Sequence, residues 1–214
     1  MAIFLAWTAG AAVMWNRSLS AEQAERRKDM ERAMQRTAIA TLNHHRHDWM
    51  NDLQIVYGYI RMGKTDKTIQ CVEQIRERMQ TESKIAKLGV PALVLFLQSF
   101  RTTTSAMVID MDIDGEVNLA EMGPEGERAA QAVIELIRAY REAAVSNGGE
   151  PARLLVDLSA DEELLTLAFY FDGELESGEA WKKNCELALK GAPLKATEWD
   201  PDKGTLMLEA QLGK

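Results

Sequence analysis

The sequence predicts an α+β protein in which a long helical hairpin precedes a layer of helices packed on one sheet. Two observations support this fold class. Between residues 18 and 62 the chain contains a single glycine and no proline, and its apolar residues recur in steps of three and four, which is typical of an amphipathic helix. From residue 106 onward, short apolar runs typical of strands alternate with helical segments and turn residues.

The first part of the chain is expected to form two helices joined by a short turn. Ser20 and Gln23 form a capping box, so we expect the first helix to start near Ser20. Gly63 is expected to end it, and Thr65 or Asp66 to start a second helix that stops at residues 89–91. A coiled-coil stripe on the first helix contains Ile39, Leu42, Arg46, Trp49, Leu53, Val56 and Ile60. Because one hairpin cannot bury this stripe alone, we expect two copies to dimerise into a four-helix bundle.

The second part of the chain is expected to form the layer of helices on a sheet. Pro124 favours a helix start, and residues 147–149, Asn-Gly-Gly, favour the end of that helix. The expected helices cover residues 91–101, 124–149 and 178–191, and the expected strands cover residues 106–114, 152–159, 164–173, 193–201 and 204–212. The chain therefore divides into an N-terminal segment 1–17, a helical hairpin 18–89 and an α+β domain 90–214.

The N-terminal segment is apolar, and its first charged residue is Arg17. It lacks the basic start of a signal peptide and is close to the shortest length that crosses a bilayer. We interpret residues 1–16 as a membrane anchor that leaves the following chain, which begins with several Arg and Lys residues, on the cytoplasmic side. The alternatives are a truncated start and a helix that packs on the protein itself.

The composition narrows the classes of function. The net charge is -8 with no long basic run, which argues against nucleic-acid binding because affinity for a phosphate backbone needs clustered Lys and Arg. Cys71 and Cys185 lie far apart and form neither a disulfide framework nor a metal-type CxxC pattern, which fits a reducing compartment. We interpret both cysteines as small buried hydrophobic residues.

All three histidines of the chain lie in the stretch LNHHRHDWMNDLQ, residues 42–54. A metal site is one interpretation, because His44 and His47 face roughly the same way on a helix. A zinc site needs further ligands, however, and the chain has no other His and no nearby Cys. Surface histidines without a role are a second interpretation, which we favour for His44 and His45. The third is phosphoryl transfer through His47.

His47 is expected one step off the apolar stripe, where an imidazole faces a partner while the backbone stays fixed. Asn51 follows one helical turn later on the same side. Asp48 is expected to support the second imidazole nitrogen, and Arg46 to balance the charge of a phosphoryl group. The candidate site is therefore His47 as phosphoryl acceptor with Arg46, Asp48 and Asn51, and no residue is assigned to a metal or cofactor.

The run His47, Asp48, Trp49, Asn51 and Leu53 resembles the phosphorylation box of the sporulation initiation phosphotransferases, the His-phosphotransfer family of the sporulation phosphorelay. More broadly, it is similar to the H-[DE]-x-x-N box of sensor kinases that have this type of helical hairpin. The segment GVPALVLFLQSFR resembles the linker into the kinase-like domain, and the element order that follows resembles a degenerate histidine-kinase ATPase fold. The resemblance implies a homodimer whose partners are receiver domains of response regulators.

Active kinases of this kind hold Mg-ATP with an Asn-bearing helix and a D-x-G-x-G loop. The matching helix, AVIELIRAYREAAV, has no Asn, and the loop position, FDGELESGEAW, keeps Asp172 and Gly173 but lacks the second glycine of the motif. Without such a loop, backbone amides cannot cradle a triphosphate. The resemblance thus implies a cytoplasmic phosphotransferase that uses no ATP. It implies that the protein passes phosphoryl groups between aspartates of response regulators and so controls sporulation initiation. The Mg²⁺ needed for these steps is then bound by the regulator. The rival classes are an ATP-dependent sensor histidine kinase with divergent motifs and a non-catalytic dimeric module that binds regulators.

Overall fold

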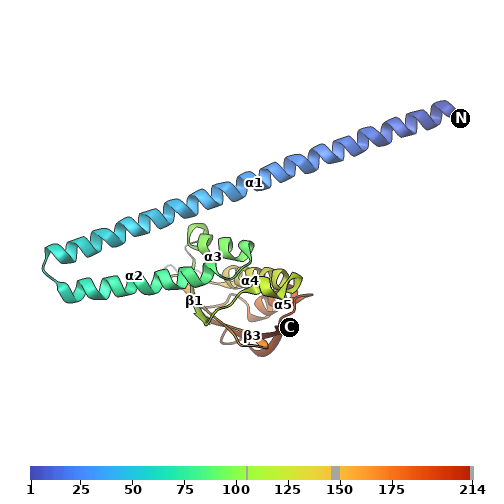
Figure 1. Ribbon diagram of the computed structural model, residues 1–214. Coiled ribbons are helices and arrows are strands. Elements are labelled where there is room, and N and C mark those ends of the chain that lie inside the picture. The colour runs from blue at the N-terminus through green and yellow to red at the C-terminus, as the bar shows by residue number, and fades with distance from the viewer. Residues whose placement is uncertain (105, 146–149, 213–214) are drawn as a thin grey trace. The chain divides into compact units, whose positions relative to one another are not determined.

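The computed structural model describes residues 1–104, 106–145 and 150–212, apart from the side chains of residues 2–19 and 101–103. The chain forms two compact units, Met1–His44 and His45–Lys214, and each is described by itself. The first unit is the N-terminal part of one long helix, and the second contains the rest of that helix, a second helix and the α+β part (Figure 1). The predicted α+β fold class is confirmed.

Helix α1 (Ala2–Arg61) is longer than the sequence predicts. It begins at Ala2, so the prediction of a helix start near Ser20 was wrong. The residues before Ser20 include no proline and many Ala, Leu and Met, which favour continued helix. Among the described residues, no helix is long and apolar enough to cross a membrane. The anchor predicted for residues 1–16 falls on side chains that, beyond Met1, lie outside the described residues.

The predicted turn between the two helices is confirmed. Gly63 has a φ of 65° and lies between α1 and α2 (Thr65–Ala86), in a left-handed conformation that glycine adopts at little cost. Its amide donates a hydrogen bond to Ile60 O at 3.0 Å and closes the last turn of α1. A second short connection leads from α2 to α3 (Pro91–Thr103), which Pro91 begins as predicted.

The α+β part contains a five-stranded sheet in the order β1-β2-β3-β5-β4. Its strands are β1 (Met107–Asp114), β2 (Ala152–Ala160), β3 (Leu164–Asp172), β4 (Lys195–Asp200) and β5 (Thr205–Gln211). β1 pairs with β2 in parallel, whereas the other pairs are antiparallel and include the predicted final hairpin of β4 and β5. Helices α4 (Pro124–Ala143) and α5 (Gly178–Leu189) lie with α3 on one side of the sheet (Figure 1).

Two local features differ from the sequence prediction. Helix α4 ends at Ala143, before residues 147–149, because Ala144 leaves the helical conformation and forms a β-bridge with Leu175. A short 3-10 helix, η1 (Leu119–Met122), was not predicted, and the Asn118 side chain caps it by accepting a hydrogen bond from the amide of Ala120. Residues 147–149, which were expected to end this helix, lie outside the described residues.

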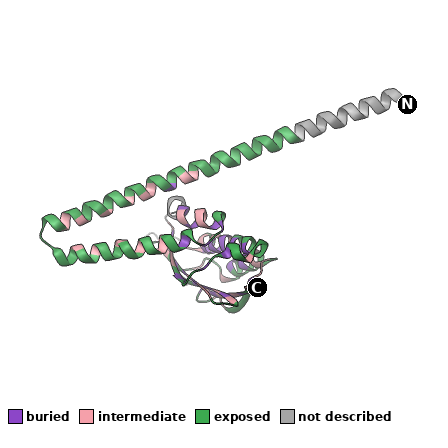
Figure 2. Cartoon of the chain, viewed as in Figure 1, coloured by how far each residue is buried: buried purple, intermediate pink, exposed green. Residues whose placement is uncertain are grey.

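The hydrophobic core lies in the α+β part, where the buried residues gather, whereas the hairpin is mostly exposed (Figure 2). Tyr140 on α4 is fully buried, packs against Phe169 and Trp181, and donates its hydroxyl to Gly204 O at 3.0 Å. Cys185 is buried as predicted, and this burial, with a further effect of the nearby Glu186 carboxylate, raises the pKa of its thiol to about 12. Cys71 is only half-buried, which differs from the prediction.

Candidate functional site

The three histidines lie on α1, where successive residues are rotated by about 100° around the helix axis. In the second unit, α1 therefore presents three faces. The outer face carries His47 and Asn51, and a second face, rotated from it by roughly 140–160°, carries His45 and Asp52 and lies against α2. The third face carries the apolar stripe and adjoins the second, since Trp49 is rotated only about 40° from His45. The side chain expected to react is thus separated from those that hold the hairpin together.

The outer face brings together two of the four predicted site residues. His47 and Asn51 are both exposed and lie one turn apart on the same side of α1. Asp48 is half-buried and borders the space between α1 and α2, so it lies between the outer face and the α2-facing side. Arg46 is exposed, is rotated from His47 by about 100° and lies in the stripe, as the sequence predicts.

Two apolar side chains flank this outer face, and sequence reasoning did not single them out. Met50 and Ile55 are 55% and 41% exposed, although neither belongs to the apolar stripe. Exposed apolar groups beside a polar centre are typical of surfaces that bind another protein. Only Ile55 carried a sequence signal, because it lies two residues after Leu53 and departs from the three-and-four spacing, whereas Met50 lies three residues before Leu53 and fits it.

The α2-facing side of α1 carries two polar contacts that the sequence analysis also missed. Arg78 on α2 donates to Asp52 at 2.9 Å, and the side chains of both residues are partly buried. His45 lies 3.8 Å from a carboxylate oxygen of Glu82. Arg78 and Glu82 are four residues apart, so they share one face of α2. A cavity of about 110 Å³ lies between the two helices beside these residues and is bordered by Trp49 and Leu53.

The apolar stripe is exposed within the single chain. Trp49, Leu53 and Ile60 are 53%, 61% and 60% exposed on α1, and Ile69 and Val72 are about half exposed on α2. Monomeric soluble proteins rarely leave so much contiguous apolar surface in water, because its burial is favourable at roughly 25 cal/mol per Å². The hairpin therefore has the surface expected of an interface with another protein.

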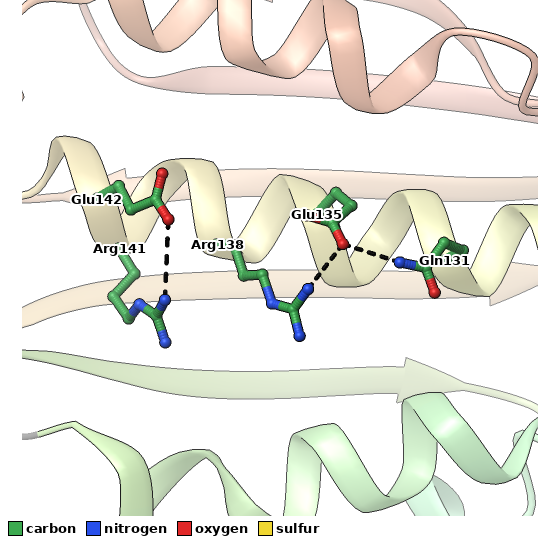
Figure 3. A network of polar contacts seen from close by, with 5 residues as sticks. All are labelled: Gln131, Glu135, Arg138, Arg141 and Glu142. Atoms are coloured by element: carbon green, nitrogen blue, oxygen red, sulfur yellow. Dashed lines mark hydrogen bonds and ion pairs between the residues drawn. The ribbon is translucent and has the colours of Figure 1, made fainter. Parts of the chain in front are cut away.

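Helix α4 contains most of the segment that the sequence analysis compares with the nucleotide-binding helix of active kinases. Its exposed side is filled by a polar network (Figure 3), in which Glu135 accepts hydrogen bonds from Arg138 at 2.7 Å and from Gln131 at 2.8 Å. Arg141 and Glu142 form a further pair at 3.9 Å. A cavity of about 290 Å³ between α4 and α5 is bordered by both Glu135 and Glu142. Arg138 borders the same cavity and pairs with Glu135 at 2.7 Å, so the rim carries charges of both signs.

The metal interpretation of the histidines gains no support from the geometry. In the ranges that the structure describes, no group of three or more His, Cys, Asp or Glu side chains is arranged to hold a metal ion. His45 contacts Glu82 on α2, whereas His47 points away from it on the outer face. The histidines are neighbours in sequence but do not converge on one point.

Part of the helical hairpin matches a known protein family. Residues 28–88 match the family described as Sensor kinase SpoOB-type, alpha-helical domain, so the resemblance predicted from the sequence is confirmed for this segment. The chain is also 29% identical over 140 residues to Sporulation initiation phosphotransferase B of Bacillus subtilis (strain 168). That alignment covers 65% of this chain and 71% of the relative.

Solved structures of histidine kinases show weaker similarity. The histidine kinase AdeS of Acinetobacter baumannii has a TM-score of 0.40 and 10% sequence identity, with 78% of this chain and 98% of that chain covered. The histidine kinase ThkA, in complex with the response regulator protein TrrA, has a TM-score of 0.38 and 14% sequence identity. That match covers 78% of this chain and 59% of that chain. At such similarity, no activity is transferred from these kinases.

Proposed function

We propose that the chain is a His-phosphotransferase of a phosphorelay that controls sporulation initiation, and that it passes phosphoryl groups between aspartates of response regulators through His47. The observation that carries this proposal is the SpoOB-type helical domain at residues 28–88, together with the relative named as a sporulation initiation phosphotransferase. The exposed position of His47 beside Asn51 on a continuous helix supports it, because such a nucleophile must reach a partner from a fixed backbone.

In the proposed reaction, a lone pair on one ring nitrogen of His47 attacks the phosphorus of a regulator's aspartyl phosphate. A P–N bond forms, the P–O bond to the aspartate breaks, and its electron pair returns to the aspartate carboxylate. The proton on the other ring nitrogen is then released, and Asp48, next to His47 in the chain, is the carboxylate proposed to receive or orient it. The reverse sequence transfers the group to a second regulator. The chain contributes positioning, and the regulator carries the Mg²⁺.

The proposal includes the expectation that no nucleotide takes part. The surface of α4 supports it, because the position that resembles a nucleotide-binding helix carries the network of Glu135 and Arg138 instead of an Asn. The phosphoryl group would then come only from an aspartyl phosphate.

The proposal also includes a homodimer. The exposed stripe of Trp49, Leu53 and Ile60 supports it, because a second copy of the same hairpin presents the same stripe and buries it in a four-helix bundle. The proposed site of action is the cytoplasm, with residues 1–16 as the segment that would attach to the inner face of the cell membrane.

The direct test is phosphoryl transfer with purified full-length protein. A panel of receiver domains is phosphorylated with acetyl phosphate and freed from excess donor, and acid-labile phosphate on the chain is then mapped. We expect rapid labelling of wild type, no labelling of His47→Gln, and most of the wild-type rate for His44→Gln and His45→Gln.

The rival classes predict different results in the same test. An ATP-dependent sensor kinase would label His47 from Mg-ATP without any receiver domain, with micromolar affinity for the nucleotide by calorimetry. A module that only binds regulators would form the complex but never carry acid-labile phosphate. Labelling of His47→Gln, or its loss in His44→Gln, would assign the reaction to another histidine.

A further inference from the structure

We infer that the ion pair between Asp52 and Arg78 is a positioning device, which fixes the rotation of α1 about its axis and thereby the direction in which His47 points. This inference rests on the proposed function and goes beyond it, because neither residue contacts the outer face that carries His47. It assigns the two residues a role in transfer that is separate from regulator binding.

The first argument is rotational geometry. His47 and Asp52 are five residues apart, so their side chains leave α1 in directions that differ by about 140°. A rotation of α1 that breaks the contact of Asp52 with α2 therefore turns His47 by the same angle. In-line attack on phosphorus requires aligned reacting atoms, and a displacement of about 1 Å can cost roughly 100-fold in rate. The orientation of α1 thus affects the reaction directly.

The second argument is that the apolar contacts of the hairpin do not fix this rotation. Trp49 and Leu53 are more than half exposed in the single chain, so they restrain α1 weakly until another chain covers them. The Asp52–Arg78 contact has the directionality that apolar packing lacks, since it is a charge-assisted hydrogen bond of 2.9 Å between residues 26 positions apart. It is a link between the two helices and not within one of them.

The third argument is that a second contact lies on the same side. His45 and Glu82 approach to 3.8 Å about two turns along α1, so both pairs lie where one face of α1 meets one face of α2. Only the Asp52–Arg78 pair is within hydrogen-bond distance, and for this reason His45→Gln is expected to keep most of the transfer rate. Asp52 is 20% exposed and Arg78 is 38% exposed. The loss of either partner leaves a partly buried charge unpaired, and rotation of α1 would then bring that charge into water.

The test compares Asp52→Asn, Arg78→Gln and the double exchange Asp52→Arg with Arg78→Asp in the full-length protein. We expect each single change to lower the transfer rate at saturating phosphorylated receiver domain by about tenfold, with the half-saturating concentration within about twofold of wild type. The double exchange should regain most of the lost rate. Phosphoramidate, a small donor that needs no docked partner, should label His47 equally in all variants. Arg153→Gln is the matched control, because it removes another non-local ion pair of 2.9 Å, with Asp110, in the sheet.

Three results would overturn the inference: no recovery in the double exchange, a raised half-saturating concentration at an unchanged maximal rate, or loss of rate only in variants that also lose the native oligomer by light scattering. Amide hydrogen exchange of residues 43–53 provides a readout that does not depend on transfer. The single changes should accelerate it and the double exchange should restore it. If wild type accepts no phosphate from any receiver domain, the proposed function fails, and the exchange data still decide whether the pair fixes α1.

Discussion

At the scale of single residues, the outer face of α1 combines exposure with a fixed backbone. A nucleophile on a mobile loop would lose conformational entropy at every encounter, whereas a side chain on a long helix has only its own rotamers to restrict. His47 and Asn51 share that face. An amide one turn from the imidazole can donate a hydrogen bond to a phosphoryl oxygen, where the negative charge is greatest.

We predict that Asn51→Ala slows transfer without abolishing it. A hydrogen bond to a charged group contributes about 1.5–3 kcal/mol, which corresponds to a rate loss of roughly 10- to 150-fold. Rapid-quench measurement of single-turnover transfer from a phosphorylated receiver domain gives the number. Gln54→Ala is the control, since this exposed side chain lies almost one turn further along α1 and should change the rate less than threefold. A rate for Asn51→Ala equal to that of wild type would remove the residue from the site.

At the scale of elements, two glycines have opposite structural roles. Gly89 has a φ of 80° in the connection between α2 and α3, and a Cβ there would lie 1.9 Å from the side-chain oxygen of Asn118. Gly58 lies inside α1, and a Cβ there would meet no atom within 4 Å. Only the first position requires glycine.

We therefore predict that Gly89→Ala lowers the free energy of unfolding by about 1–3 kcal/mol, because it adds both backbone strain and a steric clash. Gly58→Ala, the matched control, should raise the stability of α1 by about 0.5–1 kcal/mol through its higher helix propensity. Urea unfolding followed by circular dichroism compares both variants with wild type. If Gly89→Ala were neutral, the close contact with Asn118 would not be a constraint on this turn.

The elements of this chain also show what its sequence could and could not predict. Each predicted strand is present, because its apolar run and its flanking turn residues report on local structure. The position of His47 and Asn51 on one face followed from helical periodicity alone. The start of α1 was misplaced, since a capping box permits a helix start without requiring one. The Asp52–Arg78 contact was missed because it joins residues from two helices, and no local pattern specifies the register between them.

At the scale of the whole molecule, the exposed stripe is the main feature that a single chain leaves unexplained. Side chains such as Trp49 and Leu53 are more than half exposed, whereas the α+β part has a core of its own that includes Trp181 and Tyr140. The hairpin therefore depends on another protein surface for stability in a way that the α+β part does not. A second copy supplies a stripe of identical spacing, and this complementarity favours it over an unrelated partner.

The last prediction concerns that dimer. Trp49→Ala should weaken association by about 3–5 kcal/mol, the range for truncation of an aromatic side chain that is buried on assembly. Light scattering of residues 18–214 at micromolar concentration should give a dimer for wild type and a monomer, or a concentration-dependent mixture, for Trp49→Ala. Ile55→Ala is the matched control: the Ile55 side chain is 41% exposed, but it leaves α1 about 120° from Trp49 and about 160° from Leu53. Its truncation should change association by less than about 0.5 kcal/mol.

A monomeric wild type would contradict the dimer, and equal weakening by both changes would show that the interface is not the stripe. Because His47 lies on the outer face, His47→Gln should associate as wild type does, which separates loss of the reacting group from loss of assembly.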